Sequence, residues 1–155
     1  MMANSILDPQ LASPAGLEVI LGMQPSPESD ALVDALLDME CKVYPAKSPE
    51  DALAKLQFHA FQVVILEENY SLEIIGFLSS LPMAVRRNMF YILIGDSLET
   101  GNMQQSYVLS ANLVVSRTDI ATFPQLFTNF FLDNSRFYRP LFYGLQAREN
   151  KACNS

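Results

Sequence analysis

Four charged side chains follow short apolar runs in this sequence, and they are the residues best placed to do chemistry. Glu67 and Glu68 directly follow the run VVIL (63–66). Asp96 follows FYILI after one glycine, and Arg117 follows LVV after one serine. If these runs are neighbouring parallel strands, the four side chains meet at the carboxyl edge of the sheet, where open α/β folds bind ligands. They could line a site for a small anion or nucleotide; the alternative is that Gly95-Asp96-Ser97 is a simple turn.

The remaining reactive side chains form no catalytic motif. His59 is the only histidine, which excludes a His-rich metal site, and no nucleophile or orienting acid lies beside it in sequence. We therefore expect His59 to have a structural role at a helix end. Cys41 and Cys153 lie far apart and form neither a disulfide framework nor a metal knuckle. With no Walker loop and no G-x-S-x-G, the sequence predicts no enzyme, no catalytic residue, no metal site and no cofactor.

Composition limits the partners of the protein. The chain has 155 residues, enough for one domain, with 10 Lys and Arg against 17 Asp and Glu and a formal net charge of -7. So acidic a chain lacks the electrostatic footprint for nucleic acid or an anionic membrane. No apolar run approaches the roughly 20 residues that span a bilayer, and the amino terminus does not resemble a signal peptide. With two cysteines only, this predicts a cytoplasmic protein that binds neither nucleic acid nor membrane.

The apolar runs predict a parallel sheet. Each is four or five residues long and continuous rather than alternating, as is typical of a strand that is covered on both faces. The five expected strands are 17–21, 42–46, 63–66, 90–94 and 113–115. Helices alternate with them: two begin at the capping residues Ser26 and Ser48, each followed by proline. Further helices are expected over 72–81, 102–109 and from about 122 towards 148, and residues 82–88 are expected to be a solvated loop.

This order of elements predicts the fold class. Five repeats of strand and helix require right-handed crossovers and a parallel sheet with helices on both faces. A dinucleotide-binding half-domain would need a glycine-rich turn after the first strand, but the turn reads Gly22-Met23-Gln24-Pro25. We therefore predict a three-layer α/β fold with a flavodoxin-like, doubly wound, five-stranded parallel sheet of order 2-1-3-4-5. The domain should span 16–148, between a loose leader (1–15) and a tail (149–155).

From about Leu17 to Phe131 the sequence resembles the CheY-like receiver domains of response regulators. Glu50-Asp51-Ala52-Leu53 resembles the E-A-L helix of that family, and the stretch 61–67 (FQVVILE) resembles the strand that leads to its phosphoacceptor aspartate. The stretch 110–118 (SANLVVSRT) is similar to the fifth-strand pattern G-A-D-D-Y-L-x-K-P. The resemblance covers most of the predicted domain and implies the same flavodoxin-like fold.

The resemblance assigns the catalytic positions of a receiver to residues of different chemistry. The phosphoacceptor position falls on Glu67, the threonine position on Gly95 and the lysine position on Arg117. The proline that follows the lysine is Thr118, and the Mg²⁺-binding acids fall within Gly22-Met23-Gln24, where none is acidic. The resemblance thus implies a degenerate pseudo-receiver that accepts no phosphoryl group. Arg117 is expected to pair with Glu67 at a partly exposed rim, because a guanidinium fork holds a carboxylate well.

The predicted function is a phosphorylation-independent interaction module in two-component-type signalling, with an unidentified signalling protein as its partner. The alternatives are a small anion or nucleotide bound at the rim, or residual phosphorylation there. Self-association is also predicted, because aromatic residues continue far along the last helix and would be a liability in water. The candidate homodimer contacts are Phe137, Tyr138, Phe142 and Tyr143. The alternative is that this segment folds back over its own sheet.

Overall fold

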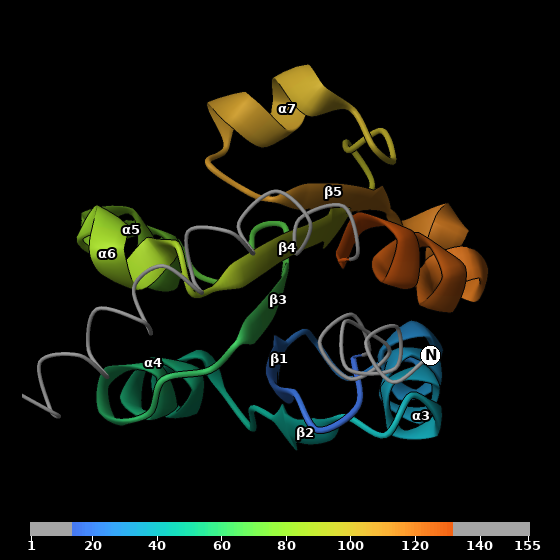
Figure 1. Cartoon of the computed structure of the whole chain (residues 1–155), viewed down its shortest axis with the longest axis horizontal. Helices are drawn as coiled ribbons and strands as arrows, with labels where there is room; N and C mark the ends of the chain where they lie inside the picture. Colours follow the sequence, from blue (N-terminus) through green and yellow to red (C-terminus); the bar gives the residue numbers. More distant parts are fainter. Residues whose placement is uncertain (1–13, 132–155) are drawn as a thin grey trace, which may run out of the picture. The chain divides into compact units, whose positions relative to one another are not determined.

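The computed structural model describes residues 14–131, in which strands and helices alternate (Figure 1). The strands are β1 (Glu18–Gly22), β2 (Lys42–Pro45), β3 (Val63–Glu67), β4 (Phe90–Gly95) and β5 (Leu113–Ser116). The helices are α3 (Pro27–Asp38), α4 (Pro49–Phe58), α5 (Leu72–Ser80), α6 (Met83–Arg86), α7 (Met103–Val108) and the 3-10 helix η1 (Arg117–Thr122). Residues 14–124 form one compact unit, and the helical residues 125–131 belong to a second.

The sheet confirms the predicted topology. All neighbouring strands are parallel, and their order is β2-β1-β3-β4-β5. The register pairs Glu67 with Ile94 and Gly95 with Ser116, so the carboxyl ends of β3, β4 and β5 lie at one edge. This edge, which we call the rim, receives the charged residues that follow the three strands.

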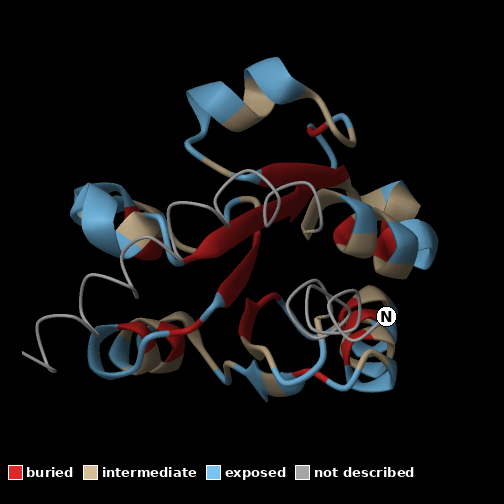
Figure 2. Cartoon of the chain, in the orientation of Figure 1, coloured by how far each residue is buried: buried red, intermediate tan, exposed pale blue. Residues whose placement is uncertain are grey.

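The hydrophobic core lies against both faces of the sheet. Strands β3 and β4 are buried along their whole length (Figure 2), which explains why their apolar runs do not alternate with polar residues. Helices α4 and α5 contribute Leu56, Ile74 and Leu78 to one core cluster, and α3 buries Leu32 and Leu36. Each such side chain contributes about 1.5–3 kcal/mol when it is fully buried, so the strands are fixed in register beneath the rim.

Serine caps set the starts of the helices. Ser26 caps α3 by accepting a hydrogen bond from the Ser29 N–H, and Ser29 returns the bond in a capping box. Ser48 caps α4 in the same way by accepting from the Asp51 N–H. The Asp51 carboxylate accepts from the Lys47 N–H and from Lys55, and these bonds lower the pKa of Asp51. The capping signals read from the sequence therefore begin these helices where they were predicted.

The prediction of a solvated loop over 82–88 is correct about exposure, since all of these residues except Arg86 are exposed, but it missed a helix. Part of this segment is the helix α6, and Arg86 is half-buried: its Nη2 donates to the Ser110 carbonyl over 2.6 Å. The Arg86 guanidinium also lies over the Tyr91 ring, 5.4 Å from its centroid. Burial lowers the pKa of Arg86 and raises that of Tyr91 to about 12. Contacts with the strand that follows and with Ser110, 24 residues along the chain, hold Arg86 in place, and the local sequence does not reveal them.

The predicted dimer contacts Phe137, Tyr138, Phe142 and Tyr143 lie outside the described residues, as do almost all of the predicted leader and the tail. Within 125–131, the rings of Phe127 and Phe131 are in contact, with centroids 5.7 Å apart. Between residues 14 and 131 no helix has the length and apolar character needed to cross a membrane.

Candidate functional site

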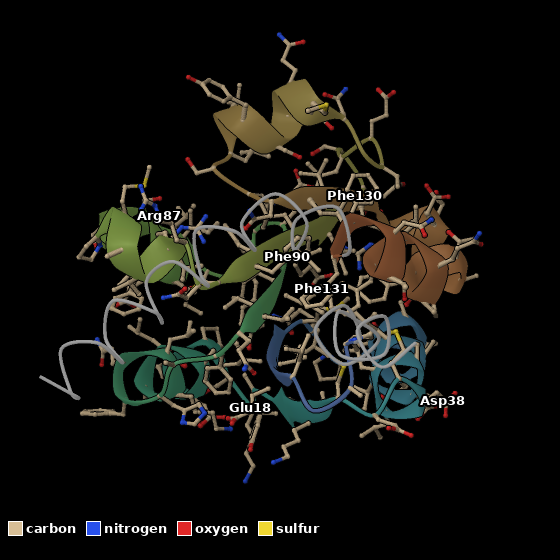
Figure 3. The ribbon with its side chains drawn as sticks, in the orientation of Figure 1. Glu18, Asp38, Arg87, Phe90, Phe130 and Phe131 are labelled. Atoms are coloured by element: carbon tan, nitrogen blue, oxygen red, sulfur yellow. The ribbon has the colours of Figure 1, made fainter. Side chains whose placement is uncertain are left out.

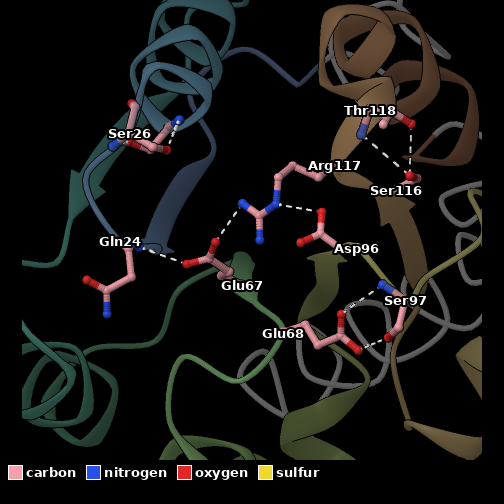
Figure 4. Close-up of polar contacts among 10 residues, drawn as sticks. Gln24, Ser26, Glu67, Glu68, Asp96, Ser97, Ser116, Arg117 and Thr118 are labelled. Atoms are coloured by element: carbon pink, nitrogen blue, oxygen red, sulfur yellow. Dashed lines mark hydrogen bonds and ion pairs between the residues drawn. The ribbon is translucent and has the colours of Figure 1, made fainter.

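Glu67, at the end of β3, is the centre of the rim. One carboxylate oxygen, Oε2, accepts from Arg117 Nη1 over 2.6 Å, and the other, Oε1, accepts from the backbone N–H of Gln24 over 2.9 Å (Figure 4). Only 11% of the Glu67 side chain is exposed. The expected pair is therefore present, and its partial exposure comes from Arg117, whereas Glu67 is buried. This carboxylate ties the loop after β1, the end of β3 and the start of η1 together.

Arg117 divides its guanidinium between two carboxylates. Its Nη1 binds Glu67, and its Nε donates to Asp96 Oδ1 over 3.0 Å. The hydrogen bond to Glu67, and then the bond to Asp96, raise the pKa of Arg117. Asp96 is largely exposed, so its bond to Arg117 contributes less than the bond from Glu67, which is shielded from water. The arginine is held from two sides and keeps its charge throughout the physiological range.

Glu68 points to the turn after β4 and binds there. Its Oε2 accepts from the Ser97 N–H over 3.2 Å, and its Oε1 accepts from the Ser97 hydroxyl. The structure thus brings Glu67, Arg117 and Asp96 together and places Glu68 in a separate contact (Figure 4). The alternative that residues 95–97 form a turn is consistent with this arrangement.

The Glu68 side chain fills the space that a side chain at position 95 would need. A Cβ atom built on Gly95 would lie 2.5 Å from the Cβ of Glu68 and would also overlap its carboxylate. Because one of these contacts is close to the backbone, rotating the Glu68 side chain alone would not relieve it. No side chain, and hence no hydroxyl, fits at position 95 while Glu68 is in this place.

The rim does not fit the Mg²⁺ ion that receiver domains use. Mg²⁺ binds oxygen ligands in near-octahedral geometry. After β1, Met23 is buried and Gln24 turns its backbone N–H, a donor, towards Glu67. The Arg117 guanidinium already lies against the Glu67 carboxylate where a cation would be needed. In the part of the chain that the structure describes, no group of three or more His, Cys, Asp or Glu residues is placed to hold a metal ion.

Sequence reasoning missed two groups that hold the rim in place. The first is the Gln24 backbone N–H, which no side-chain pattern reveals. The second is Ser116, whose hydroxyl accepts from the Thr118 N–H and so begins η1 next to Arg117. A signal for this second group was present, because Ser116 and Asp119 have the serine-to-acid spacing that is typical of a helix start.

His59 and Cys41 lie away from the rim in structural environments. His59 follows α4 and pairs with Glu18, and its ring packs edge-on against Phe61 with centroids 4.6 Å apart. The Cys41 thiol donates to the Pro14 carbonyl over 3.3 Å, and burial raises the pKa of Cys41 to about 11. A thiol with so high a pKa is protonated and unreactive at neutral pH.

Comparison with solved structures establishes the fold. The structure is similar to the chemotaxis response regulator CheY4 of Vibrio cholerae, with a TM-score of 0.54 and 16% identity over 72% of this chain and 98% of that chain. It is also similar to the signal receiver domain of the DNA-binding response regulator protein merR from Colwellia psychrerythraea 34H, with a TM-score of 0.53 and 20% identity over 71% and 97%. The chain has the receiver fold. No protein-family model matches it, and no curated protein is similar enough to count as a relative.

Proposed function

We propose that this receiver-fold domain is a non-catalytic pseudo-receiver that acts in two-component-type signalling through protein–protein contact, without phosphorylation. The observation that carries the proposal is the state of Glu67, whose two carboxylate oxygens are bound by Arg117 and by the Gln24 N–H. A carboxylate that attacks a phosphoryl group needs a free oxygen, and a metal ion and a cation must gather the transferred charge. Here the cation is bound to the carboxylate itself.

The charged groups of the rim are bound to one another. The charge of Arg117 is neutralised by Glu67 and Asp96. Gly95 has no hydroxyl that could bind a phosphoryl oxygen. A domain of this kind has no phosphoryl-dependent switch at the rim. The partner recognises a surface that is always present.

Intact-mass analysis tests this proposal. The full chain is incubated with Mg²⁺ and acetyl phosphate, with an active receiver domain in the same tube as the positive control. The expected result is an unchanged mass for this chain and an added phosphoryl group on the control. A stoichiometric phosphoryl adduct on this chain that is lost in Glu67→Gln would overturn the proposal.

A second measurement tests the interaction. The tagged chain is captured from its native cells with and without a phosphodonor, and the partners that it retains are compared. The proposal expects the same partners in both conditions and in Glu67→Gln. A partner whose capture requires the phosphodonor would contradict it.

We further propose that the protein is a homodimer in which Phe137, Tyr138, Phe142 and Tyr143 contact the second copy. The high aromatic content of this segment supports the proposal, since exposed aromatic clusters favour association. Sedimentation at micromolar concentration should show a dimer that Phe142→Ala and Tyr143→Ala dissociate. A wild-type monomer that the same substitutions destabilise would support the fold-back alternative.

A further inference from the structure

Exposed apolar side chains gather on α6 and α7. Of the described residues in these two helices, none is buried. Met83 is 74% exposed, Val108 72% and Tyr107 87%, and α7 is largely exposed in Figure 2. Monomeric proteins rarely leave such groups of large apolar side chains in water unless a partner covers them. We define the α6–α7 surface by these side chains and three others: Met83, Val85, Arg87, Tyr107, Val108 and Leu109.

Arg86 joins the two parts of this surface. It lies at the end of α6, and its Nη2 donates to the carbonyl of Ser110, directly after the exposed Leu109. The same guanidinium lies over Tyr91 of β4, so both helix ends are anchored to the sheet through one side chain. Arg86 therefore links the carboxyl ends of α6 and α7, each of which carries exposed apolar residues.

The charge of this surface is opposite to that of the rest of the protein. The chain has 17 Asp and Glu, yet residues 74–95 and 100–118, which contain α6 and α7, include none. The basic residues of these segments are Arg86, Arg87 and Arg117, and Arg117 is bound by Glu67 and Asp96 at the rim. Arg87 is exposed, and Figure 3 places it at α6, away from the acidic helix α3 with Asp38.

We propose that the α6–α7 surface binds an acidic amphipathic helix of a partner protein. The proposal rests on the proposed function as an interaction module and names its surface and the chemistry of its partner. An apolar helix face would pack on Met83, Tyr107 and Val108, a mode in which adaptable methionine is favourable. Carboxylates beside that face would meet Arg87, which gives the charge complementarity that selects the partner.

Segments of this chain match the surface less well. The carboxy-terminal segment 132–155 carries four basic residues against two acidic ones, so it would bring like charge to Arg87. In a second copy, α3 would offer the exposed acids Asp30, Asp34 and Asp38, but among its described residues the only exposed large hydrophobic is Leu37. A single leucine does not cover the apolar part of the α6–α7 surface.

Two peptides test the proposal on the full chain. The first is a labelled 20-residue helix with leucine at i, i+3, i+4 and i+7 and glutamate on both flanks; the second has lysine in place of each glutamate. Binding is measured by fluorescence anisotropy at low salt and at 0.5 M salt, without phosphodonor. The glutamate peptide should bind about ten-fold more tightly than the lysine peptide, and salt should reduce the difference.

Matched variants locate the site. Arg87→Glu should weaken binding of the glutamate peptide about ten-fold, whereas Lys42→Glu, a charge reversal at an exposed residue of β2, should not. Tyr107→Ser should also weaken binding, whereas Phe58→Ser, at a residue that is 87% exposed on α4, should not. Both pairs change surface side chains, so a circular dichroism melt should show that all four variants fold.

Three results would overturn the proposal: no binding of the glutamate peptide, equal binding of both peptides, or equal effects of the matched variants. Self-association of the free chain that Tyr107→Ser abolishes would also overturn it, because a second copy would then be the occupant. These results are independent of the proposed function, which fails on phosphorylation of Glu67 and not on peptide binding. A domain that stays unphosphorylated and binds neither peptide would refute only the α6–α7 surface.

Discussion

The rim and the α6–α7 surface differ in whether their charged side chains are bound within the domain or exposed to solvent. At the rim, four charged side chains bind one another or the adjoining turn, so each is used within the domain. On the α6–α7 surface, Arg87 and several large apolar side chains are exposed. Residues that look reactive in the sequence are therefore bound within the domain, whereas a segment that looks like a loop carries exposed apolar side chains.

Removing Arg117 should have the largest effect on stability. Arg117→Ala leaves the shielded Glu67 carboxylate with the Gln24 N–H alone, and leaving one charge of a mostly buried pair costs about 2–4 kcal/mol of the free energy of unfolding. Urea denaturation measures this loss. Arg117→Lys should lose less, since it keeps the charge and gives up the fork. A loss below about 1 kcal/mol for Arg117→Ala would show that the pair behaves as an exposed one.

Tyr91, beneath Arg86, should make the protein sensitive to alkaline pH. Burial raises the pKa of Tyr91 to about 12, so the folded state holds the phenol proton more tightly than the unfolded state does. The protonated phenol of Tyr91 therefore makes its full contribution to the free energy of unfolding below pH 10. This contribution, about 2–3 kcal/mol, is lost as the pH rises towards 12. Urea midpoints measured across this range should fall more steeply for the wild type than for Tyr91→Phe. Parallel curves for the two proteins would contradict the assignment to Tyr91.

A side chain at position 95 should destabilise the rim. Gly95→Ala places a Cβ 2.5 Å from the Glu68 Cβ, and such overpacking costs about 1–3 kcal/mol. The double variant Gly95→Ala/Glu68→Gly removes the opposing Cβ and should recover part of this loss. The double variant Gly95→Ala/Glu68→Ala keeps that Cβ and should not. Gly76→Ala is the matched control, because nothing lies within 4 Å of its Cβ position on α5. A Gly95→Ala protein as stable as Gly76→Ala would refute the overlap.

Reversing the charge on the α6–α7 surface should have the smallest effect on folding. Arg87 is exposed at the end of α6, so Arg87→Glu should change the free energy of unfolding by no more than about 0.5 kcal/mol. Thermal denaturation of Arg87→Glu and Arg117→Ala measures the contrast directly. Arg117→Ala should lower the melting temperature, and Arg87→Glu should leave it nearly unchanged. A loss comparable to that of Arg117→Ala would mean that Arg87 is part of the fold.

The sequence predicted the sheet because its apolar runs are continuous, β-branched and separated by helices with serine caps. It predicted that Glu67 and Arg117 would meet, since parallel strands bring their carboxyl ends to one edge. It did not predict the burial of Glu67 or the Gln24 N–H, because backbone donors and solvent shielding depend on packing between distant segments. The helix α6 was missed for the same reason: Arg86 is ordered by Tyr91 and Ser110, which lie outside its own segment.

The overlap between Gly95 and Glu68 constrains how this rim can change in evolution. A hydroxyl-bearing residue at position 95 is compatible with the fold only after the side chain at position 68 has shrunk or moved. The substitutions are therefore ordered: placing a hydroxyl at position 95 must begin with a change at Glu68 and the loss of its contacts to Ser97. A single exchange at position 95 passes through a destabilised protein, so it can be accepted only after position 68 has changed.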